Sequence, residues 1–359
     1  MKPQFLSPDF FKTFKIKYPI IQAPMAGGIS TPNLIANVNQ AGGIGFLAAG
    51  YLSSATLEKQ ILEVKSKSDS IFGVNLFIVD SVKLDSCIKP ENICEIEKEL
   101  EIYKNDRLNI ILDEENDKKI DVIIKNGVKI VSFTFGISPQ EWIQKLKKHD
   151  IYTVGNCTNF SEAKALETSE CDAIVVQGIE AGGHRSSFLN KIANDEIGLF
   201  ALLQEIKRNI KIPLIAAGGI ANGKSLLAAK ILGATAVQIG TGFLLTNESG
   251  AADAYKNEIL HGHAHDTVLT KDISGKKARG KMNSLITKLH SGADKILPFP
   301  VQNALTKEIR NFAASQNDPN FMSLWCGQSV NLCQKIVPVQ NFIEAMMLEY
   351  QEEIRKHDK

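Results

Sequence analysis

The stretch EAGGHRSS, residues 180–187, gathers a carboxylate, two adjacent glycines, an imidazole and a guanidinium in one short loop. It follows the apolar run AIVVQG at 173–178, which predicts a buried strand. Histidine exchanges protons near neutral pH, so His184 at a strand end is a candidate catalytic group. Gly182 and Gly183 would let a ligand approach the backbone closely.

The sequence allows two roles for each of the charged residues beside this histidine. Glu180 would either orient the imidazole or face solvent. Arg185 would pair with Glu180 or meet an anionic substrate, because a guanidinium binds carboxylates well. Lys307 is a second candidate for a substrate carboxylate, on charge alone.

Two glycine-rich loops follow apolar runs further along the chain: AAGGIANGKS at 216–225 and IGTGFLLTNES at 239–249. Glycines let backbone N–H groups approach an anion, and the helix that follows each loop would add partial positive charge. The pattern predicts a phosphate site built from Gly218, Gly219, Gly240, Gly242 and the Thr241 hydroxyl. No GxxxxGK[ST] motif occurs, which argues against a P-loop nucleotide site.

The other strand ends offer uncharged groups that suit a planar heterocycle: amides on its edge and apolar contacts on its face. These groups are Ala23, Pro24 and Met25 in APMAGG, then Asn75, Gln177 and Gln238. Flavin mononucleotide (FMN) fits, because it combines one phosphate, one ribityl chain and one ring. No carboxylate stands where a second ribose would be held, which argues against a dinucleotide.

These residues need a scaffold that brings many strand ends together. Eight short apolar runs alternate with helical stretches, and most are continuous, as expected for strands covered on both faces. The runs lie at 19–24, 43–49, 71–78, 128–136, 151–157, 173–178, 212–219 and 236–243.

Eight βα units within about 245 residues match an α/β fold, the (β/α)₈ TIM barrel, whose active sites lie at the carboxyl ends of the strands. The alternative is a doubly wound open sheet, but its GxGxxG fingerprint is missing after the first strand. Residues 79–127 are charged, and we expect two helices with a solvated face there. We expect residues 1–245 and 322–359 to form the barrel, and 246–321 a smaller, helical and loop-rich domain over its mouth.

Composition excludes several classes of protein. The formal net charge of +1 gives no electrostatic footprint for nucleic acid or for an anionic membrane. No apolar run reaches the ~18 residues of a membrane helix, and the N-terminus lacks a signal-peptide pattern. Six irregularly spaced cysteines indicate a reducing, cytoplasmic setting. HGHAH at 261–265 sets three histidines at alternate positions, but without a fourth ligand we expect a loop and no metal.

Taken together, the motifs resemble the nitronate monooxygenases, FMN enzymes once called 2-nitropropane dioxygenases, over nearly the whole length. The resemblance rests on PIIQAPMAGG, GVNLF, VVQGIEAGGHRSSF, PLIAAGGIANG, GATAVQIGTGFLLTNES and LWCGQS. It implies that His184 is catalytic. It also implies FMN contacts at Ala23, Pro24, Met25, Asn75, Gln177, Gly182, Gly219, Gln238, Gly240 and Thr241.

The implied reaction oxidises an alkyl nitronate, such as propionate 3-nitronate, with O₂ to a carbonyl compound and nitrite, which would be a detoxification. His184 would stabilise the nitronate as imidazolium or remove the α-proton of a neutral nitroalkane. Two positions depart from the family pattern: Thr134 replaces a histidine in SFTFG, and Phe299 replaces a tyrosine in PFPVQN.

Two alternatives remain open at this point. One is an FMN-dependent enoyl-[acyl-carrier-protein] reductase that uses NAD(P)H, since such enzymes share the GGH motif and the barrel. The other is a flavin-binding protein without catalysis, which the changes at Thr134 and Phe299 would permit. Expected partners are the small nitro substrate and O₂, and the chain is a candidate homodimer.

Overall fold

A computed structural model describes residues 2–189, 196–291 and 296–357. Eight parallel strands form one sheet, in the order β1-β11-β10-β8-β7-β6-β3-β2. Their bounds are Ile20–Gln22, Ala236–Ile239, Leu214–Ala217, Ala173–Gln177, Tyr152–Cys157, Ile130–Thr134, Gly73–Phe77 and Phe46–Ala48. Each lies within one of the eight runs expected from the sequence.

The sheet closes into a barrel where β1 meets the segment before β2. The Ile44 N–H donates to the Ile20 carbonyl at 3.0 Å, and the Gln22 N–H donates to the Ile44 carbonyl at 3.0 Å. The Gln22 side chain adds a third contact, since its Oε1 accepts the Phe46 N–H at 2.9 Å. The TIM barrel is therefore confirmed, and the open-sheet alternative is wrong.

Alternate strand residues fill the barrel interior, as the period of two in a strand requires. Ile21, Phe46, Ile130, Val175 and Ile215 belong to one buried cluster. The N-terminal segment closes the lower end, because Phe5 and Phe10 of the same cluster pack on Tyr152. Phe10 lies on helix α1 (Pro8–Thr13). With that end blocked, only the carboxyl ends of the strands are left to form a site.

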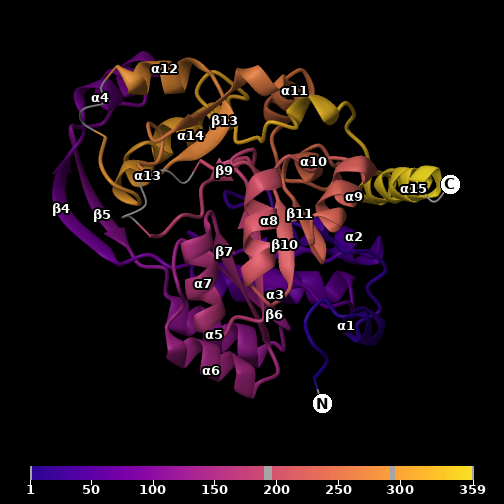
Figure 1. Cartoon of the computed structure of the whole chain (residues 1–359). Coiled ribbons are helices and arrows are strands. Elements are labelled where there is room, and N and C mark those ends of the chain that lie inside the picture. The colour runs from indigo at the N-terminus through magenta and orange to yellow at the C-terminus, as the bar shows by residue number, and fades with distance from the viewer. Residues whose placement is uncertain (1, 190–195, 292–295, 358–359) are drawn as a thin grey trace.

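The opposite strand residues meet a ring of helices through a second, larger cluster of aliphatic side chains. Figure 1 shows these helices around the sheet: α2 (Pro32–Gln40), α3 (Ser54–Lys67), α5 (Asn116–Lys125), α6 (Gln140–Lys148), α7 (Phe160–Thr168), α8 (Leu199–Asn209) and α9 (Gly223–Ile231). The long last helix α15 (Val339–His357) packs against α9 and α2 and so fills the remaining place in the ring. Val339, Ile343 and Met346 carry that contact.

The charged segment 79–127 holds more than the two helices expected from sequence. Helices α4 (Glu91–Glu99) and α5 are present, but β4 (Val82–Ile88) and β5 (Arg107–Leu112) form an antiparallel pair around α4. The prediction of helices alone was wrong. These strands are largely exposed, so they carry charged residues and lack the apolar run that marks a barrel strand.

Residues after 245, apart from α15, form a layer above the carboxyl ends of the strands (Figure 1). The short helix α10 (Thr241–Leu244) leads into this layer, which contains α11 (Asp253–Leu260), α12 (Ser284–His290), α13 (Val301–Leu305) and α14 (Lys307–Ser315). A small sheet, β12 (Thr267–Thr270), β13 (Ala278–Lys281) and β9 (Gly183–His184), joins this layer to the loop after β8.

This layer shares a third buried cluster with the β4–α4–β5 insertion, through Ile93, Ile96 and Ile110. The domain boundaries at residues 245 and 322 stay a prediction. Through this cluster, the β4–α4–β5 insertion packs against residues 246–321. In the described part of the chain, no helix has the length and apolar character needed to cross a bilayer. Within those residues there is also no group of three metal-ligating side chains.

Candidate active site

A cavity, partly open to solvent, lies at the carboxyl ends of the barrel strands. Thirteen of the residues predicted for the site line it: Ala23, Pro24, Met25, Asn75, Gln177, Gly182, Gly183, His184, Gly218, Gly219, Gln238, Gly240 and Thr241. They come from strand ends and loops far apart in sequence, and the closed barrel brings them to one rim. Their roles toward a ligand stay a prediction.

The two glycine loops shape one end of the cavity. Gly218 and Gly219 have φ values of 109° and 70°, in the left-handed region that glycine occupies at little cost. A Cβ added at Gly219 would come no closer than 3.6 Å to Glu180, and one at Gly240 no closer than 3.8 Å to Ala23. Both glycines line the cavity, and the space beside each of them is open.

The start of helix α9 does not face this space, against the expectation for the first loop. The Gly223 N–H donates to Glu349 of α15 at 2.7 Å, and the Ser225 N–H donates to the Asn222 cap at 3.0 Å. Tyr350 N would lie 2.3 Å from a Cβ at Gly223, so α15 covers this helix end. The α9 terminus is therefore not available to an anion in the cavity.

The second loop leads directly into α10, whose first residue is Thr241. The Thr241 hydroxyl accepts the Gly327 N–H at 2.9 Å, and its own proton remains to be donated to a ligand. Gly242 was also predicted to contribute, but it packs against Phe342, whose ring atom would lie 2.5 Å from an added Cβ. Gly242 is thus a packing residue.

Asn75 at the end of β3 is held in one orientation. Its Oδ1 accepts the hydroxyls of Ser132 at 2.7 Å and Thr134 at 2.9 Å. This arrangement leaves the Nδ2 donors of Asn75 for the cavity. Thr134, the first departure from the family pattern, therefore fixes an amide of the site.

Gln177 is committed to the loop that carries the histidine. Its Nε2 donates to the His184 carbonyl at 3.0 Å, and its Oε1 accepts the Ser186 N–H at 2.9 Å. The Arg185 guanidinium adds a longer contact to the same oxygen at 3.2 Å. Gln177 thus shapes the loop from the cavity wall, while Gln238 lines the wall two strands away.

The His184 imidazole stands among aromatic rings. The centroids of Phe299 and Trp325 each lie 5.6 Å from it, and that of Phe135 lies at 5.8 Å. The His184 Nε2 contacts the Ser274 hydroxyl at 2.8 Å, and that hydroxyl donates to the Lys276 carbonyl at 3.1 Å. Both contacts are hydrogen bonds only if Nε2 carries the proton, because the carbonyl can only accept. The basic lone pair is then on Nδ1.

The surroundings favour a neutral imidazole. Burial lowers the pKa of His184 to about 3, and the positive charges of Lys276 and Arg310 act in the same direction. Of the two roles considered for this histidine, the structure favours a neutral base over an imidazolium. A bound anion would raise the pKa again by favouring the charged ring.

The charged neighbours in the same loop have structural contacts. Both carboxylate oxygens of Glu180 accept the Leu199 N–H at 3.0 Å at the start of α8, so Glu180 caps a helix and does not contact the imidazole. Arg185 is fully buried and donates to the carbonyls of Gln177 at 3.0 Å and Gly178 at 2.7 Å. Neither Arg185 nor the exposed Lys307 lines the cavity.

Several lining residues escaped the sequence analysis. Arg310 and Asn303 reach the cavity from α14 and α13, and Tyr51 follows β2. Phe77, Phe135 and Asn156 are among the others, and Trp325 of the LWCGQS motif lines the cavity as well. Tyr51 lies just beyond one predicted strand and Asn156 near the end of another, and both positions were an available signal. No sequence pattern indicates that Arg310 lines the cavity, because its position depends on how the layer above the barrel packs.

Comparison with known proteins gives a consistent picture. A model of the nitronate monooxygenase family matches residues 8–349. A relative from Staphylococcus saprophyticus, described as a probable nitronate monooxygenase, is 40% identical over 327 residues, which cover 89% of this chain and 91% of the relative.

Solved structures agree with this assignment. A nitroalkane oxidase from Streptomyces ansochromogenes superimposes with a TM-score of 0.84 and 33% identity, covering 94% of this chain and 96% of its own. FabK from Thermotoga maritima gives a TM-score of 0.78 and 29% identity, with 98% of both chains covered.

Proposed function

The chain belongs to the nitronate monooxygenase family of enzymes, and from that premise we propose that it is an FMN-dependent oxidase of alkyl nitronates. O₂ would be the second substrate, and a carbonyl compound and nitrite the products. The observation that carries the proposal is the single cavity in which His184 meets both glycine loops.

The residues present fit FMN. Gly219 and Gly240 leave a cradle that any side chain would fill, and the Thr241 hydroxyl has a proton to donate there, which suits one phosphate. Asn75 offers oriented amide donors for the edge of a ring. Residues of the Ala23–Met25 loop line the same wall. When bound, FMN supplies the electron-accepting ring and the reactivity toward O₂.

The loop after β1, which lines the cavity, is itself firmly positioned. Ser30 accepts the Met25 N–H at 2.8 Å, and Gln22 donates to the same serine hydroxyl at 2.9 Å. These contacts fix residues 23–30 at the end of β1. A rigid wall of this kind holds a planar group in one place, which orients the reacting carbon of the substrate.

His184 provides the proton chemistry. With Nε2–H engaged by Ser274, the Nδ1 lone pair can take the α-proton when a neutral nitroalkane enters. A nitronate already lacks that proton, so for this substrate the imidazole only has to tolerate and orient an anion. Phe135, Phe299 and Trp325 enclose the ring and keep water from it.

The test is anaerobic mixing of the purified yellow protein with ethyl nitronate and, separately, with NADPH. We expect nitronate to bleach the visible flavin absorbance and NADPH to leave it unchanged. Readmission of O₂ should then restore the colour and release nitrite. Rapid bleaching by NADPH alone would favour the enoyl reductase alternative. A colourless protein would refute the cofactor assignment.

His184→Asn is the matched variant. We expect it to keep its flavin and to lose most turnover of neutral nitroethane, while turnover of the nitronate falls less, because only the former needs a proton removed. Equal rates for wild type and variant with both substrates would indicate that flavin binding occurs without catalysis by this histidine.

A further inference from the structure

Arg310 brings a positive charge into the cavity without a carboxylate to balance it. It lies on α14 and lines the cavity wall. Across the described ranges, Arg310 makes no ion pair with an acidic side chain. Burial lowers the pKa of this guanidinium, and Tyr51 is the neighbour that acts against that shift. A buried charge costs free energy unless something anionic meets it.

The hydrogen bonds of Arg310 leave one edge of the guanidinium open. Its Nη2 donates to the carbonyl and to Oδ1 of Asn303, at 2.7 and 3.0 Å. Its Nε makes two longer contacts, both 3.3 Å, to the carbonyl and hydroxyl of Thr306. All these acceptors belong to the end of the neighbouring helix, so they fix the plane of the guanidinium. The two Nη1 donors remain for a molecule in the cavity.

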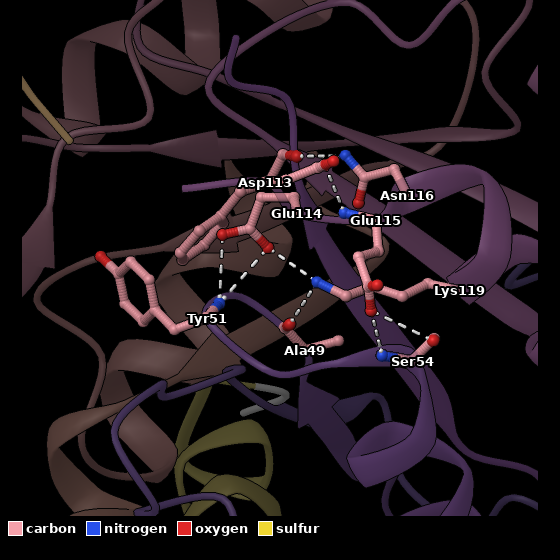
Figure 2. A network of polar contacts seen from close by, with 9 residues as sticks. Ala49, Tyr51, Ser54, Asp113, Glu114, Glu115, Asn116 and Lys119 are labelled. Atoms are coloured by element: carbon pink, nitrogen blue, oxygen red, sulfur yellow. Dashed lines mark hydrogen bonds and ion pairs between the residues drawn. The ribbon is translucent and has the colours of Figure 1, made fainter. Parts of the chain in front are cut away.

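Tyr51 stands close enough to Arg310 for the two to interact electrostatically, and it is held in an unusual backbone conformation. Its φ of 67° is rare for a residue with a bulky side chain. Figure 2 shows the contacts that hold it: the Glu114 carboxylate accepts the Tyr51 N–H at 3.1 Å and a hydrogen bond from the Lys119 ammonium at 2.7 Å. Lys119 is fully buried and also donates to the Ala49 carbonyl at 2.9 Å.

This network sets the phenol at the cavity wall. Tyr51 is 41% exposed, and burial of the rest of its side chain raises the pKa of the phenol, so the phenol stays protonated and can donate. No hydrogen-bond partner of the phenol oxygen is found in the part of the chain that the structure describes. Tyr51 and Arg310 therefore present O–H and N–H donors at the same end of the cavity.

Aromatic rings connect this end to the catalytic histidine. The Tyr51 ring packs edge-on against Phe77 with centroids 5.3 Å apart, and Phe77 lies 4.7 Å from Phe135. Phe135 in turn lies 5.8 Å from His184. The wall between the two polar ends is apolar, which suits an aliphatic chain with a polar group at each end.

We propose that Arg310 and Tyr51 form an anion-binding subsite that selects nitronates with a carboxylate at the far end of the carbon chain. The inference rests on the proposed function, because it assigns the part of the substrate that lies away from the reacting carbon. Arg310 binds the carboxylate through Nη1, and Tyr51 donates one further hydrogen bond. The guanidinium then gains the counter-ion that the protein does not supply.

The test compares substrates that differ only in this group: the nitronates of 4-nitrobutanoate and of 1-nitrobutane. For Arg310→Met we expect kcat/KM for the acid to fall at least about tenfold, mainly through KM, and that for the neutral nitronate to change less than about threefold. Arg310→Lys should recover part of the loss. Tyr51→Phe should lower only the acid value, by about threefold or more.

Lys307→Met is the matched control. It removes the same charge from the same helix at an exposed position outside the cavity, so the acid-to-neutral ratio should stay at the wild-type value. An equal loss in both variants would mean that the effect is long-range electrostatic attraction, and the subsite would be refuted.

Binding of butanoate to the flavin-loaded protein, measured by calorimetry, separates the two proposals. If the wild type oxidises neither nitronate, the proposed function fails, yet butanoate still reports on the subsite. We expect Arg310→Met to weaken this binding at least about tenfold. Unchanged butanoate affinity together with an unchanged acid-to-neutral ratio would overturn the proposal.

Discussion

Replacing His184 by glutamine should change how the stability of the protein responds to acid. The folded protein holds this imidazole at a pKa of about 3, against about 6.5 for a histidine in the unfolded chain. As pH falls below 6.5, the unfolded chain binds the proton first, so protonation favours unfolding. The folded state therefore loses stability between about pH 6.5 and pH 3 and keeps its full value above that window.

The size of the effect follows from the two pKa values. Between pH 7 and pH 5, His184 should contribute a loss of about 2 kcal/mol to the free energy of unfolding. The figure hardly depends on the folded-state value as long as that lies below about 4, because the ring then stays neutral in the folded protein at pH 5. Glutamine has no titrating group, so His184→Gln lacks this contribution.

Urea unfolding at pH 7 and pH 5 measures the contribution of His184 to the free energy of unfolding. The quantity of interest is the wild-type minus variant difference, from which the contributions of the other titrating groups cancel. We expect this difference to fall by about 2 kcal/mol on acidification. A difference that rises at pH 5 would mean that the folded state prefers the imidazolium, and our account of Lys276, Arg310 and burial would be wrong.

Three further substitutions and one control substitution test the scaffold around the site. Gly240→Val should fill the cradle and yield protein with little flavin absorbance, while urea unfolding of the apoprotein changes by less than about 1 kcal/mol, since the added Cβ clashes with nothing. Gly182→Ala should destabilise by about 1–3 kcal/mol in the same assay, because the new Cβ would lie 2.4 Å from the backbone of residue 326. Lys119→Met should cost about 3 kcal/mol by leaving a carboxylate without its buried partner, whereas Lys118→Met, in an exposed pair, should cost less than about 1 kcal/mol; equal losses would contradict the role given to burial.

The barrel was predictable because its strands are buried on both faces. Runs such as AIVVQG and IPLIAAGG are apolar at nearly every position, which few other environments tolerate. Eight such runs predict a closed barrel. A closed barrel in turn places the carboxyl ends of all its strands at one rim. Thirteen of the site residues predicted from strand ends and motifs line the cavity for that reason, whereas Gly242 of the second glycine loop packs against Phe342.

What escaped prediction depends on contacts between distant segments. β4 and β5 pair with each other and are mostly exposed, so their sequences carry no apolar run. β9 has two residues, one of them a glycine, and exists only because β13 pairs with it. Arg310 reaches the cavity because of how α14 packs, and a helical arginine has no local feature that distinguishes it from a surface residue.

The junction between β1 and the segment before β2 has a consequence for how ligands enter. Three hydrogen bonds join the edges of the sheet there, two from the backbone and one from the Gln22 side chain. This junction closes the barrel, and it leads to the loop at residues 23–30, which lines the cavity. Sheets open first where pairing is thinnest, so we expect the Ile44 amide to exchange with deuterium faster than amides such as Val131 in the middle of the sheet. Parting along this line would widen the mouth for a large planar molecule and leave the other seven strand junctions intact.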